Sequence, residues 1–241
     1  PLNIDNQNLA EYISKQAEQL IAVNREQEKL LSNLALRNQE LNDYAHIVSH
    51  DLKSPLRSIE ALVSWLKEDY GKLIGPQGLE QMELIKVHVE KMDALISGIL
   101  NYSSIDKDKR TERSIDLNKL LLETLELLPI KESVQVKIHN LPTIRADRFK
   151  IQQLFQNLIG NAVTSIENNE GTVEVLCRAL DNGYQFEVKD TGKGINPVYH
   201  EKIFQVFQKL ESDTMSTGIG LSIVKKIVHF YGGKIWLESE E

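Results

Sequence analysis

The sequence predicts an α+β protein: an N-terminal coiled coil and a helical hairpin that dimerises into a four-helix bundle, followed by an α/β sandwich domain. Two observations support this prediction. Residues 2–54 contain neither Gly nor Pro and repeat apolar residues at coiled-coil spacing. Residues 111–241 hold 9 of the 13 glycines and mix strand-like with helix-like patterns. A chain of 241 residues is long enough for between one and two domains.

The composition excludes several classes of protein. With 28 Lys and Arg against 35 Asp and Glu, the net charge is -7, and 41% of the residues are hydrophobic, which excludes a disordered chain. Neither half is basic, so no nucleic-acid partner is expected. No apolar run is long enough for a membrane segment and no signal peptide opens the chain, so the predicted location is cytoplasmic.

The lone Cys177 is expected in the core, and the start at Pro1 suggests a piece of a longer protein.

The coiled coil is predicted over residues 1–43. Twelve positions from 9 to 48 step by alternating four and three residues, and nine of them are apolar. The apolar positions are Leu9, Ile13, Leu20, Val23, Leu30, Leu34, Leu41, Tyr44 and Val48. Polar residues at Gln16, Gln27 and Arg37 are typical of seam positions that set register. One long helix lying on a globular body is the alternative, but it requires a wider apolar stripe. The coiled coil predicts a homodimer.

The hairpin is predicted over residues 44–106. Its first helix continues through Pro55, which kinks a helix without ending it, and the segment 71–78 is the expected loop. A second apolar stripe runs from Leu79 to Leu100. One hairpin is too thin to bury both stripes, whereas two form a four-helix bundle. The charged segment 106–110 is the expected linker.

The remaining residues, 111–241, are predicted to form one sheet covered on one face by helices. Asp116 and Asp147 are the expected N-caps of two helices, ending near Leu128 and Ile166. The other expected elements are strands at 134–139, 143–146, 172–179, 184–190 and 233–239, a glycine loop, a short helix, and a helix at 218–230.

Asp190 is a candidate binding residue because it ends the apolar face of the strand 184–190. Side chains alternate between the faces of a strand, which places Asp190 on the side of Phe186 and Val188. A carboxylate there is costly unless something donates a hydrogen bond to it. Two interpretations stay open, a turn-capping aspartate before the glycines or a carboxylate that binds a ligand amine.

Two further elements carry possible phosphate and metal chemistry. Asn157 and Asn161 lie one helical turn apart, and amide oxygens suit a Mg²⁺ ion that also touches phosphates. Gly218 and Gly220 open the next helix, whose backbone N–H groups can hold phosphate. Taken alone, the asparagines favour two surface amides and the glycine pair is weak evidence, so the order of these elements and Asp190 along the chain carries the inference.

His50 is a candidate nucleophile. Because Val48 and Leu52 occupy the seam, His50 is expected to face outward, where another domain can reach it. Asp51 can accept the proton of the other ring nitrogen and so raise nucleophilicity. The alternatives are an ordinary exposed histidine, or a zinc site with His46, which lacks a third nearby ligand.

Five motifs in order resemble the sensor histidine kinases of two-component systems, whose ATP domain shares the Bergerat fold with gyrase-type ATPases. They are YAHIVSHDLKSPLRS at 44–58, NLIGNA at 157–162, DTGKGI at 190–195, KIFQVFQ at 202–208 and TGIGLSIV at 217–224. The resemblance implies ATP and Mg²⁺ as cofactors, His50 as phosphoacceptor and a response regulator receiver domain as partner. An upstream sensor domain is expected outside this chain.

The resemblance also implies roles for individual residues. Asp190 is expected to bind the adenine amino group, Asn161 the Mg²⁺ and Asn157 the neighbouring polar position. The backbone around the nucleotide is expected to comprise Gly192, Gly194, Thr217, Gly218 and Gly220.

This chain departs from the family pattern at several positions. Thr164 stands where relatives often carry Lys or Arg, and Ser216 where a glycine is usual. The expected lid between Phe207 and Gly218 is short, and the chain stops at Glu241, where the family continues into a final strand. Ser54 replaces a common Thr or Asn, and since a hydroxyl can orient water, weak phosphatase activity is expected.

These motifs predict a kinase core that autophosphorylates His50 from Mg-ATP and passes the phosphoryl group to a regulator aspartate. Two other functions stay open: a coiled-coil scaffold that binds ATP as a switch, and an ATPase that transfers phosphate to water.

Overall fold

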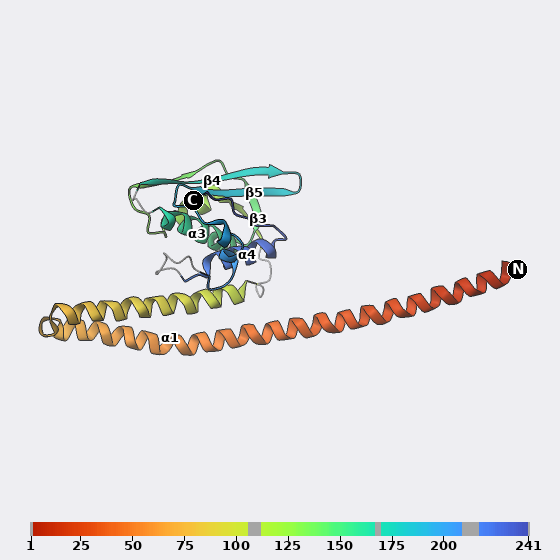
Figure 1. Cartoon of the computed structure of the whole chain (residues 1–241), viewed down its shortest axis with the longest axis horizontal. Helices are drawn as coiled ribbons and strands as arrows, with labels where there is room; N and C mark the ends of the chain where they lie inside the picture. Colours follow the sequence, from red (N-terminus) through yellow and green to blue (C-terminus); the bar gives the residue numbers. More distant parts are fainter. Residues whose placement is uncertain (1, 106–111, 167–169, 209–216, 241) are drawn as a thin grey trace. The chain divides into compact units, whose positions relative to one another are not determined.

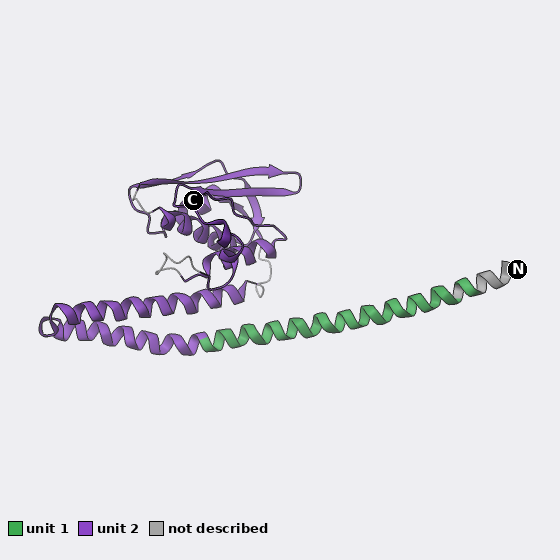
Figure 2. Ribbon diagram, in the orientation of Figure 1, with its two compact units in different colours: residues 1–48 green, residues 49–241 purple. Residues whose placement is uncertain are grey.

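A computed structural model describes residues 2–105, 112–166, 170–208 and 217–240 of the chain. It divides into two compact units, residues 1–48 and residues 49–241 (Figure 2). The expected linker at 106–110 lies outside the described residues, as does the part of the expected lid at 209–216. In the described residues, no helix combines the length and the apolar character needed to cross a membrane.

The first unit is a single helical segment of α1, which spans Leu2–Ser104 and continues into the second unit. Its predicted seam residues are exposed in the single chain, with exposed fractions of 63% for Leu20, 70% for Leu34 and 69% for Leu41. The absence of Gly and Pro before Pro55 explains why the helix is unbroken here. An apolar stripe this long, left open in one chain, is typical of a surface that another helix covers.

The second unit begins with the helical hairpin. The helix continues through Pro55, as expected, but the predicted loop at 71–78 is wrong in extent. Gly75 alone has non-helical dihedrals, with φ 74° and ψ 173°, and helical residues flank it on both sides. Glycine adopts positive φ without strain, and Pro76 directly after it suits the first turn of a helix. One residue therefore reverses the chain, and the two arms meet through a buried cluster of Leu56, Val89 and Ile96.

The α/β domain contains two small sheets with helices on one side (Figure 1). Strand β1 (Arg113–Asp116) pairs antiparallel with β3 (Thr143–Ala146). Strand β4 (Gly171–Leu180) lies between β2 (Val134–Ile138), which is parallel to it, and β5 (Gly183–Asp190), which is antiparallel. The expectation of one sheet is therefore corrected to two, and β1 was not predicted from the sequence.

The helices of this domain follow their predicted caps. Helix α2 spans Leu117–Leu125 and α3 spans Arg148–Ser165, each capped by the aspartate before it. Their apolar faces meet the larger sheet in a core that includes Phe155, Leu120 and Val175, all exposed by 1% or less. Helix α2 ends three residues before the predicted Leu128.

Two other expectations fail in the C-terminal part. The single short helix expected after the glycine loop is two 3-10 turns, Pro197–Tyr199 and Lys202–Phe204. Residues 233–239, predicted as a strand, form no strand in the described part of the chain. A strand is defined by backbone hydrogen bonds to a neighbouring strand. Ser239 instead accepts a hydrogen bond at its side chain, from Ile195 N to Ser239 Oγ at 2.9 Å.

Helix α4 (Gly220–Phe230) packs against the last turns of α1. Ile219, Ile223 and Ile227 are almost fully buried against this part of α1. Gly98 makes the close approach possible, because a Cβ added there would lie 2.8 Å from Ile219 Cδ1. Lys226 Nζ donates to the Tyr102 carbonyl at 2.7 Å and lies 4.3 Å from its ring centroid. These contacts anchor α4, at whose start Gly218 and Gly220 lie.

Candidate functional site

The first part of the site is the His50–Asp51 pair on α1. His50 Nδ1 lies 3.2 Å from Asp51 Oδ1, and the exposed fractions of the two side chains are 86% and 73%. His50 is exposed, but seam residues such as Leu41 are exposed in the single chain as well, so the outward orientation of His50 stays a prediction. Leu52, expected to face inward, is 47% exposed in the single chain. Ser54 is exposed one turn further along the same helix.

The second part of the site lies on α3, where the two asparagines differ in their surroundings. Asn157 Nδ2 donates to the Gln153 carbonyl at 2.8 Å, which turns its Oδ1 toward the start of α4. A Cβ added at Gly220 would lie 2.9 Å from that oxygen, so only glycine fits without displacement. Asn161 is exposed, and no described residue forms a hydrogen bond with its side chain. Its amide oxygen is therefore open to a ligand.

Asp190 ends β5 and is exposed, so the expected burial of this carboxylate is wrong. Its Oδ1 accepts hydrogen bonds from Ser165 Oγ at 2.9 Å and from Gly192 N at 2.8 Å. The bond to Gly192 is the predicted turn-capping contact. Oδ2 accepts no hydrogen bond from the described residues. The two interpretations of Asp190 are thus compatible, because each oxygen is available for a different partner.

The glycines are held in conformations or spaces that suit glycine. Gly194 and Gly218 have positive φ values of 76° and 68°. Gly218 O accepts from Phe207 N at 2.9 Å, and a Cβ on Gly218 would lie 2.6 Å from the Gln208 carbonyl oxygen. Thr217 is half-buried beside this contact. The two ends of the expected lid therefore meet at the start of α4.

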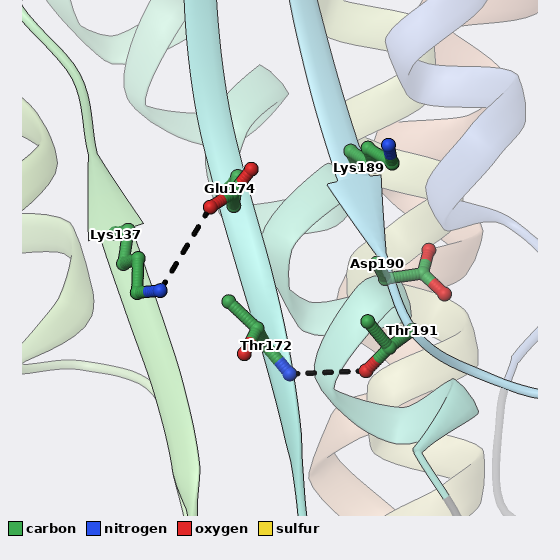
Figure 3. Close-up of a pocket in the computed structure, with 6 residues that line it drawn as sticks. All are labelled: Lys137, Thr172, Glu174, Lys189, Asp190 and Thr191. Atoms are coloured by element: carbon green, nitrogen blue, oxygen red, sulfur yellow. Dashed lines mark hydrogen bonds and ion pairs between the residues drawn. The ribbon is translucent and has the colours of Figure 1, made fainter.

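A shallow hollow of 280 Å³ borders Asp190 on the side of the sheet (Figure 3). Its other walls are side chains of β2, β4 and β5, among them the Lys137–Glu174 ion pair at 3.9 Å, and Thr191 directly after β5. In Figure 3 the Asp190 carboxylate points away from Thr172 and Glu174. Neither Asn157 nor Gly220 lines this hollow, so we place the candidate nucleotide site on the α3 and α4 side.

Ser165 is a site residue that sequence reasoning missed. It ends α3, and its contact with Asp190 joins residues 25 positions apart. A serine at the end of a helix is common, and no local pattern indicates which distant carboxylate it meets. The sequence contained no signal that could have found it.

Two family matches cover most of the second unit. Residues 40–108 match the His Kinase A (phospho-acceptor) domain, and residues 146–241 match the family described as histidine kinase-, DNA gyrase B- and HSP90-like ATPase. The first match contains His50, and the second contains α3, β5 and α4.

Among relatives, the chain is 35% identical over 237 residues to cyanobacterial phytochrome B of Nostoc sp.. It is 31% identical over 232 residues to the phytochrome-like protein Cph1 of Synechocystis sp.. Each match covers 94% of this chain and 30% of the relative, so the chain spans under a third of either protein.

A solved structure, full-length ShkA in complex with AMPPNP, is similar in fold. The TM-score is 0.62 at 23% identity, over 82% of this chain and 44% of that one. The chain therefore belongs to the sensor histidine kinases, as a core in which a phosphoacceptor domain precedes a gyrase-like and HSP90-like ATPase domain.

Proposed function

We propose that this core autophosphorylates His50 from Mg-ATP and then passes the phosphoryl group to an aspartate of a response regulator receiver domain. The observation that carries the proposal is the exposed His50, bonded to Asp51, in the same chain as a nucleotide site built from Asp190, Asn157 and Gly220. Acceptor and donor sites together are what a self-phosphorylating enzyme requires.

The chemistry at His50 follows from its contact with Asp51. When Nδ1 carries the ring proton and donates it to Asp51 Oδ1, Nε2 holds a free lone pair. A bond then forms between Nε2 and the γ-phosphorus, the bond from that phosphorus to its bridging oxygen breaks, and ADP leaves with the electron pair. The Asp51 carboxylate stabilises the positive charge that the ring acquires.

The nucleotide site assigns a task to each element around it. Asp190 Oδ2 is positioned to accept from the adenine amino group, while Gly192 and Gly194 let the backbone turn closely around the base. The N–H groups at the start of α4, near Gly218 and Gly220, suit the phosphates. Catalysis here is mainly positioning and charge neutralisation.

Mg²⁺ fits the residues present. Asn161 offers an exposed amide oxygen to which no described residue donates, one turn from Asn157, and such a ligand suits an ion that keeps most of its waters. When bound, the ion would supply charge neutralisation at the phosphates. Asn161 would hold it, and Asn157 would support the same face of α3.

The division of labour along the chain is also proposed. Residues 1–43 form a coiled-coil signalling helix, 44–106 the dimerisation and phosphoacceptor hairpin, and 111–241 the ATP-binding domain. A homodimer is supported by the apolar side chains left exposed along α1. An upstream sensor domain detects the stimulus. Because the reaction needs ATP, the core is expected in the cytoplasm.

Incubation with γ-labelled ATP tests the activity. Acid-labile, base-stable label on the protein, transferable to a receiver domain, is the expected result. Release of free phosphate without protein label would instead indicate an ATPase, and neither product would leave a scaffold that only binds ATP.

His50→Gln is expected to abolish the protein label and to leave ATP affinity unchanged, because the acceptor and the nucleotide site lie on different elements. Label retention is measured with γ-labelled ATP, and affinity by calorimetry on the same preparation. His88→Gln, a change at another histidine of the hairpin, is the control and should keep wild-type labelling. Label that persists in His50→Gln would place the acceptor elsewhere.

A further inference from the structure

Ser165 is the last residue of α3, and its hydroxyl reaches across to Asp190 at the end of β5. The proposed function leaves this contact without a task. We propose that Ser165 is a positioning residue that fixes the Asp190 carboxylate so that Oδ2 selects a nucleobase amine. The inference rests on the proposed ATP site and deepens it, because it names what determines the choice of base.

The proton count at Ser165 supports the assignment. Its Oγ lies 2.9 Å from Asp190 Oδ1 and 2.8 Å from the Ala162 carbonyl oxygen, and both partners are acceptors. A serine hydroxyl carries a single proton. Hydrogen bonds to an ionised acceptor are the stronger ones, so the proton is directed mainly to the carboxylate. The hydrogen bond from Ser165 Oγ to the Ala162 carbonyl is correspondingly weaker than the one to Asp190.

The two oxygens of Asp190 consequently differ. Oδ1 accepts from Ser165 Oγ and from Gly192 N at 2.8 Å, which occupies its two lone pairs. An ionised carboxylate can only accept hydrogen bonds. Oδ2 therefore faces the ligand as a fixed acceptor. It suits the 6-amino group of adenine and opposes the 6-carbonyl oxygen of hypoxanthine, because two acceptors repel each other.

The surroundings of Ser165 leave it little freedom to move. Lys193 N donates to the Ser165 carbonyl at 3.3 Å, so the loop after β5 holds the main chain of this residue as well. A Cβ added at Gly192 would overlap Ser165 Oγ and lie 2.6 Å from Ser165 Cβ and 2.7 Å from Asp190 Oδ1. Gly192 is therefore the residue that lets the serine reach the carboxylate.

Affinities of the full chain for Mg-ATP and Mg-ITP test the proposal, since ITP has a carbonyl oxygen in place of the 6-amino group, together with a proton on N1. Ser165→Ala should lower ATP affinity by about threefold to tenfold, the range for one lost hydrogen bond. ITP affinity should change less, so the ATP to ITP ratio falls. Thr164→Ala is the matched control, because its hydroxyl donates to the Gly160 carbonyl at 2.8 Å and, among the described residues, has no contact with Asp190. That variant should keep the wild-type ratio.

A double-mutant cycle provides the second measurement. In an Asp190→Asn background, Ser165→Ala should leave the ratio unchanged, because the carboxylate that it positions is gone. Equal losses for ATP and ITP in Ser165→Ala, or no loss at all, would overturn the positioning role while the wild type still binds ATP. A wild type that binds neither nucleotide would overturn the proposed function itself.

Discussion

At the scale of single residues, the helix that carries His50 presents two polar side chains, Asp51 and Ser54, about one turn apart on an exposed face. Asp51 contacts the ring of His50, whereas Ser54 lies one turn away, and no described residue forms a hydrogen bond with its hydroxyl. The Ser54 backbone carbonyl, by contrast, accepts a hydrogen bond from Ser58 Oγ at 3.3 Å. The Ser54 hydroxyl is thus available to a water molecule, while Asp51 contacts the His50 ring.

Ser54→Ala is expected to lower dephosphorylation of the regulator and to spare autophosphorylation. A hydroxyl can orient the attacking water, whereas a methyl group cannot. Both rates are measured on one preparation, with Ser58→Ala as the neighbouring control. If both activities fall together, Ser54 instead supports the helix around Pro55.

At the scale of elements, the two aspartate caps determine where the helices of the ATP domain begin. Asp116 Oδ1 accepts from Asn118 N at 2.9 Å and from Lys119 N at 3.4 Å. Asp147 Oδ1 makes the equivalent contacts to Phe149 N and Lys150 N at 2.9 and 3.1 Å. Each cap satisfies N–H groups that have no partner inside the helix. The second cap starts the helix that carries both site asparagines.

Hydrogen bonds from the Lys119 backbone and the Asn118 side chain hold the pKa of Asp116 below its ordinary value of 3.8. A carboxyl group whose pKa is lower in the folded state stabilises the protein above its unfolded pKa, and this contribution is lost as the pH falls through the folded value. Asp116→Asn keeps a capping side chain but does not titrate.

We therefore expect the urea midpoint of the wild type to fall more steeply than that of Asp116→Asn below about pH 4, the ordinary range of an aspartate pKa. The measurement is urea unfolding between pH 2 and 6. Glu126→Gln, at the other end of α2, controls for the loss of one negative charge. Parallel curves for wild type and Asp116→Asn would contradict the assignment.

At the scale of the whole molecule, the question is whether α1 transmits a signal or only joins two chains. The apolar positions alternate by four and three residues up to Val48, two residues before His50. A coiled-coil seam has a defined phase, so rotation of the helix upstream is expected to change the orientation of the phosphoacceptor.

One residue inserted near Asn24 in the full-length protein should change or invert the response to the stimulus. Such an insertion turns everything upstream by about 100° relative to the hairpin, whereas seven residues restore the phase of the seam. The readout is label on His50 with and without the stimulus, and the seven-residue insertion is the matched control. Identical regulation in both variants would show that signalling is independent of helix phase.

Much of this protein follows from short-range chemistry that its sequence determines alone. The caps at Asp116 and Asp147, the unbroken helix before Pro55 and the contact of His50 with Asp51 depend on residues within one or two helical turns. The glycine motifs likewise mark where the backbone must turn. Local interactions of this kind are encoded by neighbouring residues, so the pattern is sufficient to predict them.

Only the tertiary structure decided which distant groups meet. Ser165 reaches Asp190 across 25 positions, and the Asn157 amide oxygen lies against Gly220. The pairing of β1 with β3, and the unpaired segment at 233–239, also depend on partners far along the chain. Such contacts are set by how helices and strands pack in three dimensions, and no local pattern specifies them.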